Sequence, residues 1–460
     1  MSNAAAPLHR MAPLVPPAAR AVLSALEAGG YEAWLVGGWV RDALRGVAAH
    51  DIDIATNAPW QQTAQLCTRQ GFAVLETGTR HGTVTVIAQN TAFEVTTFRT
   101  ESAYHDHRHS DEVRFVQTIE EDLARRDFTI NAMAYHPERG LRDPHNGQAD
   151  LARHVIRCVG NPSDRFAEDA LRIVRGLRFA SQLSFELEAA TEQAAFATAQ
   201  DLNRVAGERL AAELEQLLCG EAVRATLMRY VDILGVIIPP LLTMKGFDQH
   251  NHWHIYDVLE HTACVIEHTQ PDPLARWAAL FHDMGKPDTF TLDEKGIGHM
   301  YGHPDMSVEH LRVAAKRLHF SNKMLHNVSL LVRYHDDHPA ATRKSVRKLF
   351  IKLDGDEHLF HVMCDLMRAD SLGKAPFAYE RTQLIDEVEA LFNTMIAEER
   401  CFSLKDLPIN GTDIMALGVA QGPEIGRILN ALFDAVINEQ IKAEHEELIA
   451  YAQTLIATSD

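Results

Sequence analysis

The chain has 460 residues, more than one ordinary domain contains, and carries 44 Lys and Arg against 63 Asp and Glu. The apolar share of 46% and the charged share of 23% are typical of globular proteins and exclude general disorder. The formal net charge of −19 excludes attraction of a polyanion by total charge, so any nucleic-acid binding would depend on a local basic surface.

The sequence shows no sign of a membrane-bound or secreted protein. The longest apolar stretches, such as residues 231–242, are too short and too interrupted to cross a bilayer, and the N-terminus lacks an apolar core of signal-peptide length. The 6 cysteines are scattered without a Cys-x-x-Cys pair, which argues against a disulfide framework and against a cysteine zinc site. We therefore expect a cytoplasmic protein with reduced thiols and no membrane partner.

The first third of the chain has the pattern of a small mixed sheet with helices. Residues 34–36 form a short apolar segment, and residues 51–54, 83–86 and 93–95 alternate with a period of two. From about residue 164 onward, apolar residues recur at helical spacing and strand signals nearly vanish. The sequence therefore predicts an α+β protein in which an α/β head precedes a long helical remainder.

One helix at the start of this remainder carries residues that are important below. Phe166, Ala170, Ile173 and Leu177 recur at intervals of three or four residues, which predicts one apolar stripe on a single helix. Residues 161–164 just upstream supply a proline and possible N-caps for this helix.

A glycine pair and an aspartate pair in the head indicate phosphate chemistry. Gly37 and Gly38 let backbone N–H groups approach a phosphate because no Cβ blocks the way, and Arg41 adds positive charge about one turn later. Asp51 and Asp53 lie two apart on a strand, so both carboxylates point to one face. Such carboxylates repel unless a cation lies between them, which favours Mg²⁺ with nucleotide phosphates, in a two-metal arrangement. The alternative is a solvated strand end with two surface acids.

Further charged residues follow in the head. Glu94 lies on an otherwise apolar strand, where it is either a third carboxylate near the metal or a partner of Arg99. Residues 125–135 place two guanidiniums, a carboxylate and an amide beside an apolar helix start. Because arginine recognises triphosphate oxygens and Asp or Asn can hydrogen-bond ribose hydroxyls, this segment favours binding of a nucleoside triphosphate.

Together these motifs resemble the head of class II tRNA nucleotidyltransferases, the CCA-adding enzymes of the polymerase-β-like superfamily. The resemblance rests on Gly37-Gly38-x-x-Arg41-Asp42 followed by Asp51-x-Asp53, on residues 78–86 and on residues 125–135. It continues through residues 143–147, 156–162 and 165–180, so ordered motifs cover residues 30–220.

The resemblance implies a role for each matching residue. Asp51 and Asp53 would hold the catalytic Mg²⁺, and Gly37, Gly38 and Arg41 would contact the triphosphate. The remaining nucleotide-binding residues would be Arg126, Asp127 and Asn131 for the ribose, Asp169 and Arg172 for the base, and Arg175 and Arg178 from the same motif.

Helical geometry also supports the role of Asp169 and Arg172. Residues three apart share a helix face, so these two side chains would project together and offer acceptors and donors to the Watson–Crick edge of C or A. The two amino acids would then select CTP or ATP without a nucleic-acid template. The alternative is a surface ion pair.

Two segments bear on which related activity the head has. Residues 104–110 depart from the Gly-Arg-Arg-Pro-like residues that the family more often carries, but their full length favours CCA or A addition over CC addition. Residues 78–86 differ from the segment that bacterial poly(A) polymerases usually carry there.

The helical remainder contains a second set of candidate ligands. His261 is followed by the dyad His282-Asp283 and by Asp370, with Asp365 as a rival for the last position. This order resembles the HD phosphohydrolase superfamily, and its imidazoles and carboxylates suit a divalent metal of the Mg, Mn, Ni or Co class.

The HD resemblance covers residues 247–371 and implies a metal-dependent phosphatase or 2′,3′-cyclic phosphodiesterase that acts on damaged tRNA ends. His303 and His335 would bind a second metal or phosphate oxygens. An intact ligand set is equally compatible with a purely structural site.

The densest basic stripe consists of Arg343, Lys344, Arg347 and Lys348, which recur at helical intervals. This stripe either contacts the tRNA backbone or forms a solvated face balanced by nearby acids. Recognition of tRNA would depend on its shape and acceptor end rather than on base sequence.

The sequence thus predicts a polymerase-β-like nucleotidyltransferase head over residues 1–155 and an all-α neck over 156–220. An HD-type body over 221–375 and a helical tail over 376–460 follow. The predicted activity is template-independent addition of C, C and A to the 3′ end of tRNA from CTP and ATP, beside an HD phosphohydrolase activity. The alternatives are an A-adding enzyme, a poly(A) polymerase, or a degenerate nucleotide- or RNA-binding head on an HD hydrolase. The oligomeric state stays open.

Overall fold

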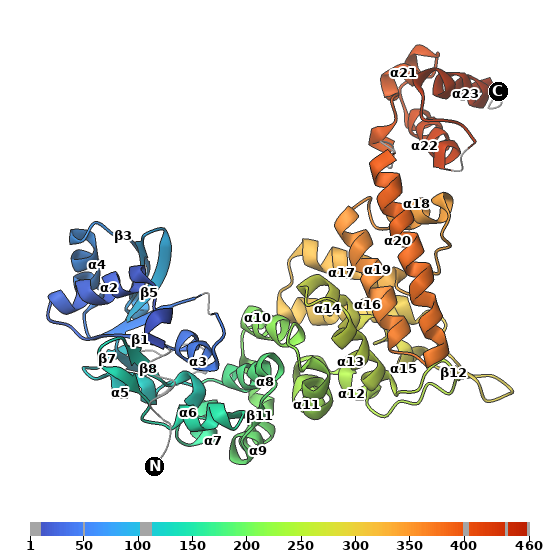
Figure 1. Cartoon of the computed structure of the whole chain (residues 1–460). Helices are drawn as coiled ribbons and strands as arrows, with labels where there is room; N and C mark the ends of the chain where they lie inside the picture. Colours follow the sequence, from blue (N-terminus) through green and yellow to red (C-terminus); the bar gives the residue numbers. More distant parts are fainter. Residues whose placement is uncertain (1–10, 49–50, 102–112, 399–403, 438–439, 458–460) are drawn as a thin grey trace. The chain divides into compact units, whose positions relative to one another are not determined.

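The computed structural model describes residues 11–48, 51–101, 113–398, 404–437 and 440–457 (Figure 1). The chain divides into two compact units: an N-terminal unit of Met1–Ala222 with Asp232–Ile237, and a C-terminal unit of Val223–Val231 with Ile238–Asp460. The division passes through helix α11 (Val223–Ile237), whose backbone leaves helical geometry at Tyr230. Residues 104–110, which bear on the choice between related activities, lie outside the described residues.

A seven-stranded mixed sheet forms the centre of the N-terminal unit (Figure 1). Its spatial order is β3 (Ala73–Gly78), β4 (Thr83–Ala88), β5 (Thr91–Thr97), β2 (Asp53–Thr56), β1 (Ala33–Val36), β8 (Ala134–His136) and β9 (Gly140–Arg142). The pair β2–β5 is parallel and the other neighbouring pairs of this sheet are antiparallel. The expected strand segments are β1, β2, β4 and β5, except that β2 begins at Asp53 and leaves Asp51 just outside.

Helices cover this sheet and continue from it. The helices of the unit are α2 (Pro17–Ala28), α3 (Gly38–Arg45), α4 (Trp60–Arg69), α5 (Ile119–Ala124), α6 (Gly147–Ala152), α7 (Pro162–Glu168), α8 (Leu171–Leu183), α9 (Ala189–Thr198) and α10 (Gly207–Leu218). Two small strand pairs accompany them, β6 (Arg99–Glu101) with β7 (Val113–Phe115) and β10 (Val155–Ile156) with β11 (Glu186–Leu187). The apolar faces of α2 and α4 join those of β1, β4 and β5 in one buried core. This core fixes the sheet on which the candidate site residues lie.

The single helix expected across residues 166–177 is wrong, because the chain breaks at Asp169. Helix α7 ends at Glu168, and Asp169 is extended with φ −150° and ψ 104°. Its carboxylate Oδ1 accepts a hydrogen bond from the N–H of Leu171, the first residue of α8, at 3.0 Å. Local side-chain capping of this kind competes with helix continuation. The apolar stripe is nonetheless buried on both sides of the break.

The C-terminal unit is helical, which confirms the predicted α+β layout of a mixed-sheet head and a helical remainder. Its helices are α12 (Pro240–Met244), α13 (Val258–His268), α14 (Pro273–Phe281), α15 (Lys286–Thr289), α16 (His303–Leu318), α17 (Asn322–Tyr334), α18 (Arg343–Lys352), α19 (Glu357–Leu372) and α20 (Glu380–Glu398). They are followed by α21 (Gly411–Ala416), α22 (Pro423–Ile437) and α23 (His445–Ala457). A short hairpin, β12 (Thr291–Leu292) and β13 (Gly298–His299), precedes α16.

The C-terminal unit is built from helices that pack in two groups. Helix α19 packs against α13, α14 and α20, and α16 packs against α17. The last three helices build a separate core around Ile414, Ile428, Leu432 and Leu448. Among the described residues, no helix combines the length and the hydropathy that a membrane span requires.

Candidate nucleotide site and candidate metal cluster

Three carboxylates gather at the start of β2. Asp53 is the first residue of β2, Asp51 lies two residues before it, and the parallel register pairs Asp53 with Glu94 on β5. Burial and then the charge of Glu94 raise the pKa of Asp53; Arg126 acts in the opposite direction, and Asp51 adds to the rise. A cation would relieve this excess of negative charge, and oxygen ligands suit Mg²⁺, so the donor set fits the predicted magnesium site. The register favours Glu94 as a third carboxylate near the metal.

Gly37 brings the backbone close to these acids. Its φ of +71° lies in the left-handed region, which glycine adopts without strain. A Cβ there would lie 3.4 Å from Asp53 Oδ2 and 3.3 Å from Arg126 Nη1. Helix α3 begins at the next residue, Gly38, so its N-terminal N–H groups lie beside the same acids, where a triphosphate would need them.

A cavity of about 590 Å³ in the N-terminal unit collects the predicted nucleotide-binding residues. It is lined by Asp53 and by Gly37, Gly38, Arg41, Arg126, Asp127, Asn131, Asp169, Arg172, Arg175 and Arg178. The other lining residues include Arg99, Arg125 and Arg209, so eight arginines face three aspartates. This cavity is a local basic surface of the kind that an acidic chain needs in order to bind a polyanion.

Hydrogen bonds hold the arginines of the cavity in place. Arg41 Nη1 donates to Asn131 Oδ1 at 2.9 Å, which connects α3 to the short 3₁₀ helix Thr129–Asn131. The buried carboxylate of Asp122 pairs with Arg125 at 2.9 Å and with Arg126 at 3.2 Å. Asp122 was not predicted as a site residue, because its pattern in the sequence is that of any acid in the first turn of a helix.

Asp127 is a buried carboxylate that accepts two hydrogen bonds. Its Oδ1 accepts from the N–H of Phe128 and its Oδ2 accepts from Arg175 Nε, both at 2.8 Å. Burial alone would raise the pKa of Asp127, but Arg175 and the N–H of Phe128 lower it below the usual value. Arg178 pairs with Glu213 at 3.0 Å. The carboxylate therefore stays ionised and can accept a hydrogen bond from a sugar hydroxyl.

Asp169 and Arg172 share the cavity but not a helix face. Asp169 Oδ2 pairs with Arg209 at 2.6 Å, whereas Arg172 pairs with Glu168 at 2.8 Å and donates to the carbonyl oxygen of Arg125 at 3.2 Å. The predicted i,i+3 geometry is wrong because of the break after Glu168. Both side chains line the nucleotide cavity from opposite sides of that break. Arg209, on α10, was missed because no local motif marks it.

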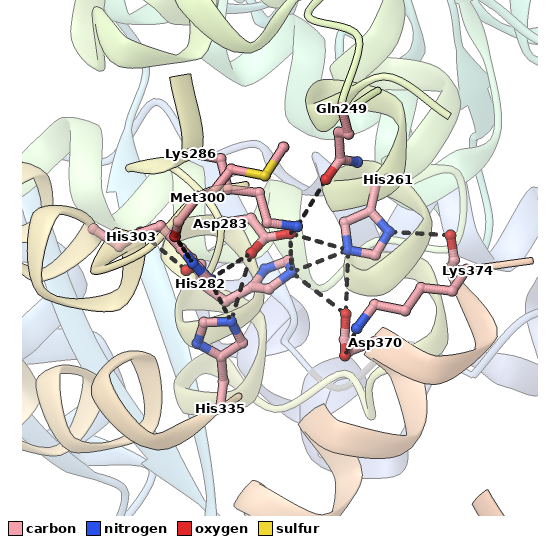
Figure 2. Close-up of polar contacts among 12 residues, drawn as sticks. Gln249, His261, His282, Asp283, Lys286, Met300, His303, His335, Asp370 and Lys374 are labelled. Carbon is pink, nitrogen blue, oxygen red and sulfur yellow. Dashed lines mark hydrogen bonds and ion pairs between the residues drawn. The ribbon is translucent and has the colours of Figure 1, made fainter. Parts of the chain in front are cut away.

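The four predicted HD ligands meet in the core of the C-terminal unit (Figure 2). His261 comes from α13, His282 caps α14 with Asp283 next to it, and Asp370 comes from α19. His261 Nε2 lies 3.2 Å from Asp283 Oδ2 and 3.2 Å from Asp370 Oδ1, and His282 Nε2 lies 3.2 Å from Asp283 Oδ2. The rival Asp365 instead accepts a hydrogen bond from a backbone N–H elsewhere.

Two more histidines contact the other oxygen of Asp283 (Figure 2). His303 is the first residue of α16 and His335 caps α17. Their Nε2 atoms lie 3.3 and 3.5 Å from Asp283 Oδ1. Asp283 therefore belongs to two groups of potential ligands among the described residues, one with His261 and His282 and one with His303 and His335. Such a bridging carboxylate has the geometry for two adjacent metal ions.

The tautomer of each histidine in this cluster is set by the backbone. The Nδ1 atoms of His261, His282, His303 and His335 lie 3.0, 2.7, 2.9 and 2.7 Å from the carbonyl oxygens of Gly373, Ala279, Met300 and Val332. A carbonyl oxygen only accepts, so Nδ1 carries the proton and a neutral ring has its lone pair on Nε2. Nε2 atoms face each other at 3.3 Å in the pairs His261–His282 and His303–His335. A cation resolves the resulting lone-pair repulsion, so the donor set fits a divalent metal.

Two lysines complete the cluster. Lys286 Nζ lies 2.6 Å from Asp283 Oδ2 and donates to Gln249 Oε1 at 2.8 Å, and Lys374 Nζ lies 2.6 Å from Asp370 Oδ2. Burial would raise the pKa of Asp283, but His282 and Lys286 hold it well below its usual range. The acids are therefore ionised at neutral pH, as metal ligands must be.

The four cations of the predicted basic stripe on α18 are not all exposed. Arg347 is buried with 4% of its surface exposed, and Arg343 pairs with Glu398 at 2.5 Å. Arg347 is on the inner face because it lies three residues before Phe350, which shares its side of the helix and is buried in the core. Lys344 and Lys348 are exposed, so the predicted tRNA contact is reduced to these two.

Three family models match successive parts of the chain. Residues 33–157 match the poly A polymerase head domain. Residues 184–243 match the probable RNA and SrmB-binding site of polymerase A. Residues 305–452 match tRNA nucleotidyltransferase domain 2.

Two relatives that align along almost the whole chain are both described as CCA-adding enzymes. The CCA-adding enzyme of Limosilactobacillus fermentum is 33% identical over 445 residues, which cover 95% of this chain and 96% of the relative. That of Lactiplantibacillus plantarum is 31% identical, with 95% of each chain covered. The crystal structure of the Bacillus stearothermophilus CCA-adding enzyme in complex with CTP superposes with a TM-score of 0.71 and 26% identity, covering 98% of both chains. The Thermotoga maritima CCA-adding enzyme complexed with tRNA shares the fold, with a TM-score of 0.56, 19% identity and 98% of both chains covered.

Proposed function

We propose that this chain, which belongs to the family of CCA-adding enzymes and is thus a tRNA nucleotidyltransferase, adds C, C and A to the 3′ end of tRNA from CTP and ATP. The observation that carries the proposal is the cavity of about 590 Å³, in which carboxylate, glycine turn and arginines occur together. A phosphate-binding backbone, a metal-binding acid and base-reading side chains are what such an addition requires.

In the proposed reaction the tRNA 3′-hydroxyl attacks the α-phosphorus of the nucleotide and pyrophosphate leaves. Mg²⁺ bound to Asp51 and Asp53 would activate the hydroxyl and neutralise the charge on the leaving group. Gly37 and Gly38 admit the triphosphate close to the backbone, and Arg41 binds its oxygens.

Sugar and base are assigned to the remaining residues of the cavity. Arg126, Asp127 and Asn131 orient the ribose, since the ionised Asp127 accepts hydrogen bonds while Asn131 both donates and accepts. Asp169 and Arg172 present an acceptor and a set of donors to the base edge, with Arg175 and Arg178 beside them. Selection of C or A then follows from protein hydrogen bonds, since no template strand is needed.

The C-terminal unit is proposed to hold a metal-dependent phosphohydrolase, either a phosphatase or a 2′,3′-cyclic phosphodiesterase. The supporting observation is the position of Asp283 between two pairs of histidines whose Nε2 atoms face inward. Divalent metal of the Mg, Mn, Ni or Co class would supply an activated water there. Lys286 and Lys374, which pair with Asp283 and Asp370, would bind phosphate oxygens, and Asp370 with His261 would complete the ligand set.

One assay separates the proposed activities from their alternatives. A tRNA that ends at its discriminator base is incubated with CTP and ATP separately and together, and 2′,3′-cyclic AMP is offered with each divalent metal. A CCA enzyme adds two residues with CTP and a third only after ATP, whereas an A-adding enzyme or a poly(A) polymerase extends that substrate with ATP alone.

Matched variants assign each activity to its unit. We expect Asp53→Ala to abolish addition and retain hydrolysis, and Asp283→Ala to abolish hydrolysis and retain addition. Normal addition by Asp53→Ala would refute the assignment of Asp53 in the head, whereas hydrolysis without any addition in the unmodified enzyme would favour a degenerate head that serves an active hydrolase. Metal-stimulated hydrolysis by Asp283→Ala would refute the metal cluster as its source.

A further inference from the structure

A second cavity, of about 540 Å³, lies in the C-terminal unit and has aromatic walls. Trp253 and Phe377 both line it, each with 49% of its surface exposed, and their ring centroids lie 4.9 Å apart. The ring of His252 stacks on Phe377, with 5.7 Å between centroids. Half-exposed aromatic faces inside a cavity offer a surface for a flat, apolar partner.

This aromatic cavity adjoins the metal cluster. A cavity of about 300 Å³ is lined by Asp283, His303, His335 and Asp370. His254, Gly298, His299 and Lys374 line both cavities, so the two lie side by side. The aromatic walls are therefore the nearest apolar surface for the rest of a molecule whose phosphate lies on the metal cluster.

Polar groups between the two cavities suit a nucleotide. Lys374 pairs with Asp370 at the cluster, and Arg381 lines the aromatic cavity, so cations flank the aromatic rings. The Nδ1 of His254 is buried and lacks a hydrogen-bond partner among the described residues. This ring nitrogen can therefore exchange a hydrogen bond with a molecule bound in the cavity.

We infer that the aromatic cavity holds the nucleobase of a nucleotide whose phosphate lies on the metal cluster. The inference rests on the proposed hydrolase and adds to it a subsite for the base of a nucleotide that is either free or at the end of an RNA. Stacking on Trp253 and Phe377 tolerates any base, because every base has a π-face. A lipid or an apolar peptide would not need the cations at the junction of the two cavities.

The test compares a substrate that has a base with one that has none. The full-length enzyme is incubated with Mn²⁺ and either 3′-AMP or glycerol 2-phosphate, and kcat/KM is measured for both. Trp253→Ala is expected to lower the ratio of these two kcat/KM values on the order of 10-fold, mainly through the KM for 3′-AMP, as loss of one stacking contact predicts. Trp253→Phe is expected to restore most of the ratio.

Tyr379→Ala is the matched control, because Tyr379 is a half-exposed aromatic in the same short helix as Phe377 but does not line the cavity. An equal loss of activity on both substrates in Trp253→Ala, or the same ratio in all variants, would overturn the inference. A short RNA that ends in a 3′-phosphate identifies the source: a higher kcat/KM than for 3′-AMP assigns the site to RNA ends, and a lower one to free nucleotides.

Absence of hydrolysis in the unmodified enzyme would refute the proposed hydrolase without deciding this inference. Equilibrium binding of AMP and of inorganic phosphate, measured by calorimetry with Mn²⁺ present, then decides it. Weaker binding of AMP to Trp253→Ala relative to phosphate supports the nucleobase site. The same relative affinity in both proteins contradicts it.

Discussion

Asp53 lies in an environment that opposes its ionisation. Burial and the neighbouring Glu94 raise its pKa above the ordinary 3.8, and Arg126 only partly compensates. Without metal, Asp53 thus contributes stability that is fully present below that ordinary value and lost as the pH rises through its raised pKa. A bound Mg²⁺ reverses this balance, because it favours the ionised form.

This environment predicts how nucleotide addition depends on pH. Protonation of Asp53 removes a metal ligand, so activity at fixed Mg²⁺ is expected to fall as the pH drops through the raised pKa. Glu94→Gln removes the neighbouring charge that raises this pKa most, so it should shift the low-pH fall in activity (the acid limb) to lower pH and weaken the apparent affinity for Mg²⁺. The measurement is kcat/KM for CTP as a function of pH at two Mg²⁺ concentrations.

The control for this prediction is Glu76→Gln, which removes an exposed carboxylate from β3 in the same sheet. It should leave both the acid limb and the Mg²⁺ dependence in place. An acid limb that stays unmoved in Glu94→Gln would show that Glu94 does not act on Asp53.

At the scale of elements, the metal cluster depends on helix ends that meet closely. Gly285 follows Asp283 by two residues, and its N–H donates to Ser307 Oγ at 2.8 Å, while that hydroxyl donates to the carbonyl oxygen of His282 at 2.9 Å. These bonds hold the end of α14 against the start of α16, which carries His303. The distance between the two helices thus sets how His303 faces Asp283.

Gly285→Ala is predicted to separate the two helices. The added Cβ would lie 2.6 Å from the carbonyl oxygen of His303 and 2.6 Å from the N–H of Ser307, and neither backbone atom can rotate away. Overpacking of this kind costs about 1–3 kcal/mol, and we expect a similar loss of stability with at least about a tenfold weaker affinity for Mn²⁺. Titration calorimetry and thermal unfolding measure the two effects.

Gly426→Ala in α22 is the matched control, because nothing lies within 4 Å of its added Cβ. It should bind Mn²⁺ normally and unfold at the same or a slightly higher temperature. Normal Mn²⁺ affinity in Gly285→Ala would mean that α16 does not position a ligand.

At the scale of the whole molecule, the charge is distributed unevenly. The chain carries a net charge of −19, yet the nucleotide cavity is lined by eight arginines and three aspartates. The acidic remainder repels a polyanion, so tRNA binding must depend on a few basic places and on the salt concentration. Besides this cavity, Lys344 and Lys348 on α18 are the exposed part of the predicted basic stripe.

The salt dependence of tRNA binding tests whether α18 takes part. If both lysines contact phosphates, Lys344→Glu with Lys348→Glu should reduce the slope of log K against log salt by about 1–2, at roughly 0.7–0.9 for each lost contact. Filter binding over a range of salt concentrations measures this slope. The pair Lys295→Glu with Lys323→Glu, also exposed in the C-terminal unit, is the control; an equal slope in the two variants would exclude α18.

The sequence by itself determined the layout and most of the candidate residues, because those signals are local. A short apolar run marked β1, period-two alternation marked β2, β4 and β5, and helical spacing marked the remainder. The glycine pair, the two aspartates and the arginine-rich segments marked the candidate nucleotide residues, which line one cavity with the exception of Asp51. Residue type and order likewise identified the four metal-ligand candidates, since a histidine, a His-Asp dyad and a later aspartate form a pattern that is readable along the chain.

Only the tertiary structure decided which groups face one another, because those contacts join residues that are far apart in the chain. In the structure the expected helix is interrupted at Asp169, the carboxylate of Asp169 pairs with Arg209, and Arg347 is buried. Asp370 contacts His261 in the cluster whereas Asp365 does not, and Asp283 lies between two histidine pairs. A pattern of a few residues encodes local conformation and burial, whereas the partner of a buried charge is set by how whole helices pack.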